Sequence, residues 1–173
     1  MCIVVDTNTI ARVFDKNNSE HEEFKPVHDW IMEKKGKLVY GGTKYFEELE
    51  KMGQYLKLLT VLSKINKTVV VDTEAVDDYQ AEAEHKIQHK DFDDPHLVAI
   101  LKVSVCKLVC SVDERAFPFL KHHLFFKGKE KPKIYSSSRN KDLLCDANIA
   151  ECCQPSSDTT NEQKKILEST NSM

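Results

Sequence analysis

The segment Ile3-Val4-Val5-Asp6-Thr7-Asn8-Thr9 decides the fold of this chain. Three β-branched residues in a row are typical of a buried strand, and the polar residues that follow them end it. A carboxylate directly after such a strand stands at the carboxyl edge of a parallel sheet, where α/β proteins carry their functional groups. The segment therefore predicts a first strand with Asp6 at the functional edge.

Short apolar runs and longer helical periods alternate along the rest of the chain. Further strands are predicted at residues 38–40, 68–71, 108–112 and 133–135. Between them, apolar residues recur at intervals of three and four, which is typical of amphipathic helices. The predicted helices cover residues 24–31, 46–62, 76–87, 95–101 and 116–121. We expect Gly36 to end the first helix and Gly53 to bend the second. This alternation predicts a three-layer α/β/α fold with a central, mostly parallel five-stranded sheet.

Length and composition set the broad class of the protein. The chain has 173 residues, of which 40% are hydrophobic and 31% charged, and its formal net charge is −3. These values favour one globular domain over a disordered chain. No apolar run reaches the roughly 18–20 residues of a membrane-spanning helix, and the start lacks the basic region of a secretory signal. We therefore expect no membrane association and a cytoplasmic location.

The chain changes character after residue 150. Residues 1–150 are expected to form the domain, and residues 151–173, rich in Ser, Thr, Asn and Gln, a polar and mobile tail with little to bury. The chain has six cysteines. A disulfide framework is not expected in a long chain without a secretory signal, so Cys152 and Cys153 are predicted to be free. Cys106 and Cys110 lie in an apolar run and are predicted to be buried.

Acidic residues stand where the predicted strands end or helices begin. Asp6 and Asp113 directly follow the first and fourth strands. Asp94 precedes a helix, and Glu48 or its neighbour Glu47 lies early in the helix after the second strand. Carboxylates about 4 Å apart repel by about 4 kcal/mol per pair at an effective dielectric near 20, so such a cluster needs a cation. Oxygen ligands suit Mg²⁺ or Mn²⁺, which activate water for phosphodiester cleavage.

Four segments, in order, resemble the motifs of PIN-domain nucleases. The first has the opening Asp-x-Asn, the second a helix that carries a Glu, the third an acid before a Leu/Ala-rich helix, and the fourth Ser-x-Asp after a strand. They lie at residues 5–9, 41–49, 93–99 and 111–113. The resemblance covers about residues 2–135. It implies a PIN-like fold and a metal-dependent endoribonuclease, a class that includes bacterial toxins, RNA-processing enzymes and members without activity.

The resemblance also implies roles for matching residues. Asn8 is expected to hold Asp6 or a metal-bound water, and Ser111 to orient Asp113 or a phosphate. Metal binding is implied for the three aspartates, with Glu48 beside them as ligand or base. The implied catalytic set is Asp6, Glu48, Asp94 and Asp113.

Two positions in this set have alternatives. The leucine after Glu48 favours it over Glu47, and the distance to Ala99 favours Asp94 over Asp93. The chain differs from compact toxins in a polar stretch at residues 15–19, which is expected to delay the helix after the first strand.

A basic segment follows the last of these motifs. From residue 115 to residue 141 there are eight Lys or Arg residues and one acidic residue. We expect the segment to contact RNA phosphates, and Phe125, Phe126 and Tyr135 to stack on bases. A solvated surface loop is the alternative. The expected phosphate contacts are Arg115, Lys121, Lys127, Lys129 and Lys131.

Several questions stay open at this level. His96 is compatible with a ligand or a base, but a histidine on a helix surface is the favoured interpretation. Phosphatases of the haloacid-dehalogenase type need a second acid where this chain has Asn8, and are disfavoured. The main alternative to the nuclease is an inactive PIN-fold module that binds RNA or protein. Expected partners are RNA, an antitoxin or regulatory protein, and a second copy of the chain through the helix at residues 46–62.

Overall fold

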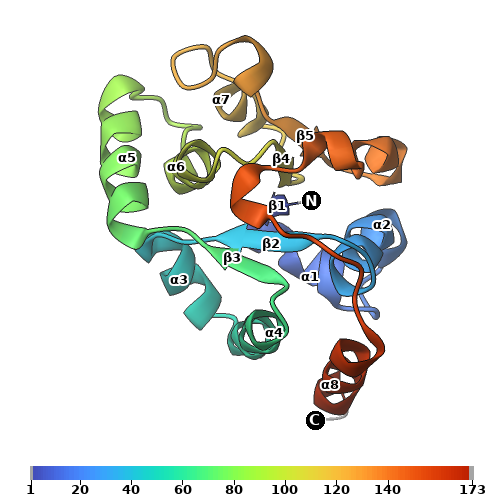
Figure 1. Ribbon diagram of the computed structural model, residues 1–173. Helices are drawn as coiled ribbons and strands as arrows, with labels where there is room; N and C mark the ends of the chain where they lie inside the picture. Colours follow the sequence, from blue (N-terminus) through green and yellow to red (C-terminus); the bar gives the residue numbers. More distant parts are fainter. Residues whose placement is uncertain (1, 172–173) are drawn as a thin grey trace.

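The central sheet consists of parallel strands in the order β3-β2-β1-β4-β5. The computed structural model describes residues 2–171 and has the three-layer α/β/α arrangement that the sequence predicts (Figure 1). Each strand lies within one residue or two of its predicted place. The strands are β1 (Cys2–Val5), β2 (Lys37–Tyr40), β3 (Thr68–Val70), β4 (Leu108–Cys110) and β5 (Lys133–Tyr135).

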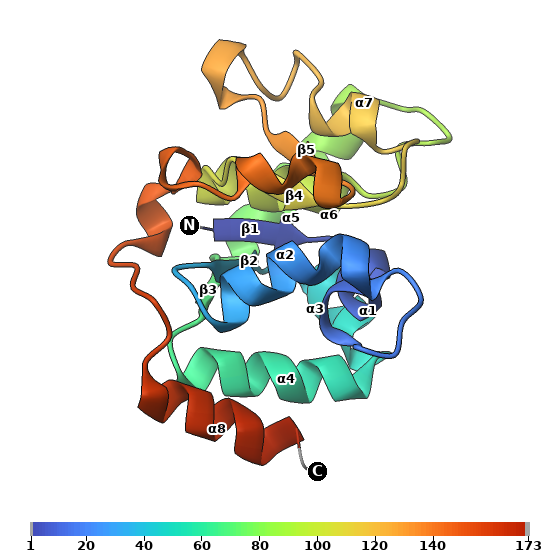
Figure 2. The same cartoon turned by 90° about the vertical axis from the view of Figure 1, so that its right-hand side faces the viewer.

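Helices cover both faces of the sheet. On one face lie α1 (Ile10–Phe14), α2 (His21–Met32), α3 (Thr43–Glu50) and α4 (Gly53–Lys64). On the other lie α5 (Thr73–Lys86) and α6 (Pro95–Ser104), with the short α7 (Phe117–Leu120) beyond them (Figures 1 and 2). The last helix is α8 (Asn161–Asn171), and short 3₁₀ turns are η1 (Thr7–Thr9), η2 (Gly128–Glu130), η3 (Ser138–Leu143), η4 (Asp146–Asn148) and η5 (Glu151–Cys153). Among the described residues, no helix has the length and apolar character that crossing a membrane requires.

The strand order places a switch point between β1 and β4. The chain first adds strands outward from β1 to β3, then crosses back through α5 and α6 and continues from β4 to β5 on the other side. In open parallel sheets, ligands bind in the crevice at the carboxyl ends of the strands where the order reverses. In Figure 2, β1 runs from the amino terminus towards the right, and α1 and α7 lie at that carboxyl end.

Two helices begin and end differently from the prediction. A helix follows the first strand without delay, because η1 and α1 come before the polar stretch at residues 15–19. The predicted helix over residues 46–62 is two helices, which separate at Lys51 and Met52, directly before Gly53. The bend expected near Gly53 is thus a complete break.

Gly36 has a role other than the predicted helix cap. Helix α2 already ends at Met32, and Gly36 follows as a close neighbour of Trp30, whose carbonyl accepts a hydrogen bond from the Gly36 N–H at 2.9 Å. A Cβ atom at Gly36 would lie 2.3 Å from Cδ1 of the Trp30 ring. Glycine is therefore required here for space rather than for an unusual backbone conformation.

The C-terminal segment is folded against the domain, contrary to the prediction of a tail with little to bury. Helix α8 packs beside α4 (Figure 2), and Leu167 is buried between them. Gln163 donates a hydrogen bond to the carbonyl of Ile65 at 2.6 Å, and the Thr159 N–H donates to Glu33 at 3.0 Å. Main-chain carbonyls of the domain thus accept hydrogen bonds from a segment whose own composition is polar. Residues 172–173 lie outside the described residues.

The prediction that Cys153 is free is also wrong. Cys2 in β1 and Cys153 in η5 form a disulfide, with their Cα atoms 6.0 Å apart. The chain after η4 returns to the amino end of β1, and this return brings together two cysteines separated by 151 positions. Cys106 and Cys110 are buried and free, as predicted. The expected cytoplasmic location stays a prediction.

Tyr45 provides a test of how α3 is fixed to the sheet. Its hydroxyl donates a 2.6 Å hydrogen bond to the Val5 carbonyl, and the side chain is fully buried. Tyr45→Phe removes the donor and leaves a buried carbonyl without it. We expect the free energy of unfolding, measured by urea denaturation, to fall by about 1–2 kcal/mol. Tyr79→Phe, at a partly exposed position, is the matched control and should cost less than about 0.5 kcal/mol. Equal effects of the two substitutions would contradict the assigned role.

Candidate functional site

Asp6 is the most deeply fixed acid at the switch point. Its side chain is 1% exposed. Oδ2 accepts a 2.7 Å hydrogen bond from the Ser111 hydroxyl, and Oδ1 accepts one of 3.0 Å from the Asn8 N–H. The Ser111 oxygen also accepts a hydrogen bond from the Asp113 N–H at 3.2 Å. Ser111 therefore joins the ends of β1 and β4, whereas Asn8 contributes its main chain and leaves its side chain exposed.

Glu48, Asp94 and His96 form what we call the inner group. One ligand atom from each residue lies within 4.8 Å of the other two. Glu48 comes from the second turn of α3, and its Oε2 accepts a 2.6 Å hydrogen bond from the Thr7 hydroxyl. Asp94 is the residue before α6, and His96 is the second residue of that helix. Segments after β1, after β2 and before β4 thus contribute to one cluster.

Asp93, Asp94 and Asp113 form the outer group, again with ligand atoms within 4.8 Å of one another. Asp94 belongs to both groups. Arg115 lies against the outer group, because its Nη2 is 2.8 Å from Asp113 Oδ2 and 3.5 Å from Asp93 Oδ2. Its Nε donates a further hydrogen bond to Asp113 Oδ1 at 3.1 Å. The outer group therefore has a cationic side chain of its own.

The acids respond differently to these surroundings. Burial raises the pKa of Asp94 to about 6, with the charge of Asp6 as the next cause. Burial also raises the pKa of Asp6, although the hydrogen bonds from Ser111 and Asn8 oppose it. The Arg115 guanidinium lowers the pKa of Asp113. Without a cation, Asp94 is thus the acid at this edge that most readily keeps a proton.

Burial also acts on Glu48 and would raise its pKa, but the nearby His96 ring and the Thr7 hydroxyl outweigh it, so the net pKa is lowered. His96 Nε2 lies 3.5 Å from Glu48 Oε2. At this distance the contact is electrostatic rather than a well-formed hydrogen bond. Glu48 is therefore held as a carboxylate that faces the interior of the group.

His96 corrects the expectation of a histidine on a helix surface. It is 1% exposed, and within the described chain neither ring nitrogen has a hydrogen-bond partner. The reason is the position of α6, which packs between α5 and the sheet so that every residue from Pro95 to Leu101 is buried. The unbroken apolar run after His96 is typical of a helix buried on all sides, and was the available signal.

The donor set fits a divalent cation. The inner group combines two carboxylates with a buried imidazole that lacks a hydrogen-bond partner, and the outer group adds two further carboxylates. Oxygen donors of this type bind Mg²⁺ and Mn²⁺, and imidazole extends the range to other transition metals. Such an ion would be held by Glu48, Asp94 and His96, or by Asp93, Asp94 and Asp113.

The alternatives left open by the sequence differ in position. Glu47 is exposed and lines another part of the surface with Thr43 and Asp77, away from both groups. Asp93 is in the outer group only, whereas Asp94 is in both. Thr7 was not singled out by its sequence, because its contact with Glu48 depends on how α3 docks.

The predicted RNA contacts lie at different ends of the sheet. Arg115 lies at the acidic edge, and Lys121 follows Leu120, which lines a narrow space with Asp94. Lys129 instead lines a hollow with Lys107, which precedes β4 and so lies at its amino end. Lys127 and Lys131 flank Lys129 at η2. The structure does not bring these three lysines to the acids.

The aromatic residues expected to stack on bases are part of the core. Phe125 and Phe126 are each 2% exposed, and Tyr135 is fully buried. The Tyr135 hydroxyl donates a 2.9 Å hydrogen bond to the carbonyl of Glu23. The prediction that these residues stack on bases is therefore wrong. Their rings are buried and anchor the loop after α7 and the strand β5.

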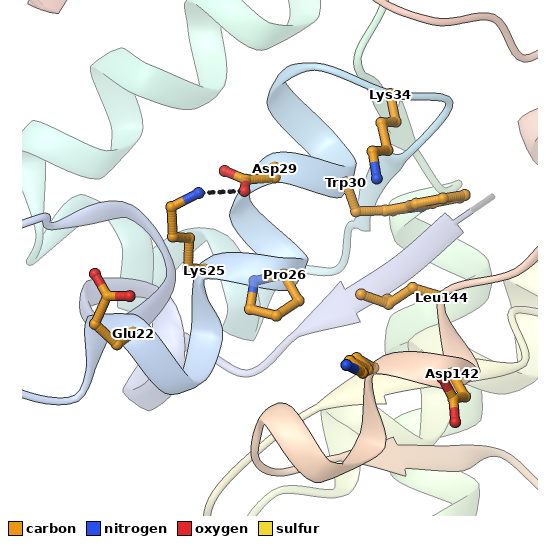
Figure 3. Close-up of a pocket in the computed structure, with 9 residues that line it drawn as sticks. Glu22, Lys25, Pro26, Asp29, Trp30, Lys34, Asp142 and Leu144 are labelled. Atoms are coloured by element: carbon orange, nitrogen blue, oxygen red, sulfur yellow. Dashed lines mark hydrogen bonds and ion pairs between the residues drawn. The ribbon is translucent and has the colours of Figure 1, made fainter.

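An open hollow lies elsewhere, between α2 and residues 141–144 (Figure 3). It measures about 460 Å³ and is open to solvent. The Trp30 ring forms part of its wall, and Lys25 pairs with Asp29 across α2. Acidic and basic residues are balanced around it, and no described group of metal-ligating side chains gathers there. We therefore assign the functional site to the acidic edge.

Comparisons with protein-family models, with curated proteins and with solved structures give no match to this chain. The function of this chain is therefore inferred from its residues and their geometry.

The raised pKa of Asp94 predicts a dependence of stability on pH. The unfolded chain has the ordinary Asp pKa near 3.9, and the folded chain has about 6. The folded state binds more protons between these values, so its stability should fall as the pH rises through this range. Asp94→Asn should remove most of this fall, leaving the part due to Asp6. The measurement is urea unfolding in chelator from pH 4 to pH 7, with the exposed Asp78→Asn as control. Equal pH slopes in the parent and Asp94→Asn would contradict the assignment.

Proposed function

We propose that this chain is a divalent-metal-dependent endoribonuclease, as its resemblance to PIN-domain nucleases implies. The observation that carries the proposal is the convergence of acids from four separate segments on Asp94. Asp94 belongs to both the inner and the outer group. Among the neighbouring charges, that of Asp6 raises the pKa of Asp94 most. Gathering so many like charges costs free energy unless a cation offsets it, which supports a metal site.

The residues around the acids support this chemistry. When bound, a divalent ion supplies an activated water and stabilises the charge that develops on a phosphodiester. Ser111 and the Asn8 N–H hold Asp6 in one orientation, and Thr7 does the same for Glu48. Carboxylates fixed in this way lose little freedom when they take up an ion. Glu48, whose pKa is lowered, is available as a ligand or as a base.

RNA cleavage is the direct test. A mixed pool of structured and single-stranded RNAs is incubated with the parent protein and Mn²⁺, Mg²⁺ or EDTA. We expect cleavage with either of the ions but not with EDTA. Asp6→Asn, Asp94→Asn and Asp113→Asn should each lower the rate by about 100-fold or more, because each loses several kcal/mol of stabilisation at the ion.

The control for this test is Asp78→Asn, which removes an exposed carboxylate on α5 and should leave the rate unchanged. Cleavage that survives Asp6→Asn and Asp94→Asn would refute the proposal. A parent protein that never cleaves, with a melting temperature that no divalent ion raises, would favour the inactive binding module. The pairing of Arg115 with Asp113 and Asp93 is the observation that keeps that module as the second candidate.

We further propose that RNA is held by Arg115, which lies at the acidic edge, and by Lys121, which follows Leu120 beside Asp94, rather than by Lys129. Lys121→Gln should weaken the binding of single-stranded RNA and reduce the slope of log affinity against log salt by about 0.7, the value for one phosphate contact. Lys129→Gln makes the same change in charge at the other end of β4 and is the matched control. Fluorescence anisotropy at several salt concentrations measures both. Equal losses for the two variants would contradict this placement.

A further inference from the structure

We propose that the inner group binds a divalent transition-metal ion with His96 as a nitrogen ligand beside Glu48 and Asp94, in preference to Mg²⁺. This inference deepens the proposed function, on which it rests, by naming the class of ion and a ligand outside the four acids. It assigns a role to His96, a histidine that is almost completely buried at the carboxyl edge of the sheet.

Among the residues that the structure describes, His96 is buried without a hydrogen bond to either ring nitrogen, which is unfavourable. A polar group buried without a hydrogen bond destabilises the folded state, and such groups are rare. His96 has two ring nitrogens in this condition within the described chain. One of them lies within 4.8 Å of a carboxylate oxygen of both Glu48 and Asp94. An ion shared by the three residues would give the ring a partner.

The outer and inner groups differ in how much positive charge lies beside them. The outer group is already neutralised in part by Arg115, at 2.8 Å from Asp113 and 3.5 Å from Asp93. The inner group has a weaker contact: the largely exposed Lys44 lies 3.8 Å from Glu48 Oε1, and no ion pair among the described residues involves Asp94. The Thr7 hydroxyl orients Glu48 but carries no charge. The inner group is therefore the less fully neutralised of the two.

The donor atoms of the inner group, two carboxylates and one imidazole, favour a transition metal. Mg²⁺ prefers oxygen ligands and usually keeps several waters, whereas a neutral imidazole suits transition metals. One imidazole with two carboxylates matches Mn²⁺ and the ions after it in the first transition series better than Mg²⁺. The Thr7 hydroxyl, hydrogen-bonded to Glu48, would serve as the supporting contact that ligating carboxylates usually have.

Pulsed electron paramagnetic resonance of Mn²⁺ tests the inference. The full chain is freed of metal with a chelator, and one equivalent of Mn²⁺ is added. We expect ¹⁴N modulation from a directly bound imidazole in the parent and its loss in His96→Gln. His123→Gln, an exposed histidine, is the matched control and should keep the modulation. Calorimetry should give Mn²⁺ an advantage of about tenfold or more over Mg²⁺, most of which His96→Gln removes.

A measurement without mutation covers the case in which His96→Gln does not fold. Incorporation of ¹⁵N-histidine into the parent should replace the ¹⁴N pattern by that of ¹⁵N. Bound Mn²⁺ without nitrogen modulation overturns the inference, as does equal affinity for Mn²⁺ and Mg²⁺. RNA cleavage in Mg²⁺ without nitrogen modulation would leave the proposed function standing and the inference refuted. Nitrogen modulation in a protein that cleaves no RNA would leave the inference standing and the proposed function refuted.

Discussion

Repulsion among carboxylates at the carboxyl edge of the sheet is the constraint on which the rest of the site depends. The acids there are compensated to different degrees. Ser111 and a main-chain N–H serve Asp6, and Arg115 serves Asp113. Asp94 receives neither a cation nor a strong donor among the described contacts, and burial raises its pKa to about 6. The charge that this edge leaves uncompensated is therefore concentrated on the acid that both groups share.

The topology makes this concentration unavoidable. β1 and β4 pair in parallel, with Val5 opposite Cys110, so the residues after them emerge side by side where the strand order reverses. Helix α6 must pass over the same edge to enter β4, and its first turn is buried beneath α5. The sheet order thus brings Asp6, Asp94 and Asp113 together without any local preference for clustering. Helix capping accounts for Asp6, which accepts a hydrogen bond from the Asn8 N–H, but not for Asp94, whose side chain makes no capping hydrogen bond to α6 in the described chain.

The sequence predicted what depends on local pattern and missed what depends on docking. β-branched runs identify strands, and a carboxylate after a strand has a definite edge in a parallel sheet, so Asp6 and Asp113 could be found. His96 was misjudged because its burial depends on what covers α6 rather than on its own helix. Helix α8 and the disulfide of Cys153 were missed for the same reason, because both depend on how the C-terminal segment packs against the domain. The polar composition of that segment does not show this packing.

The charge balance of the edge has a consequence for the order of binding. Five carboxylates, those of Asp6, Glu48, Asp93, Asp94 and Asp113, lie there against two cations, the guanidinium of Arg115 and the exposed ammonium of Lys44, leaving the edge negative. RNA is a polyanion, and such a field opposes its approach over about a Debye length, roughly 8 Å at physiological salt. Under the proposed function, a divalent ion must therefore join the edge before a phosphate can reach it. The same ion would reduce the field that holds Arg115 on the outer group. An arginine that pairs with acids in the free protein is thus compatible with one that contacts phosphate in the loaded protein.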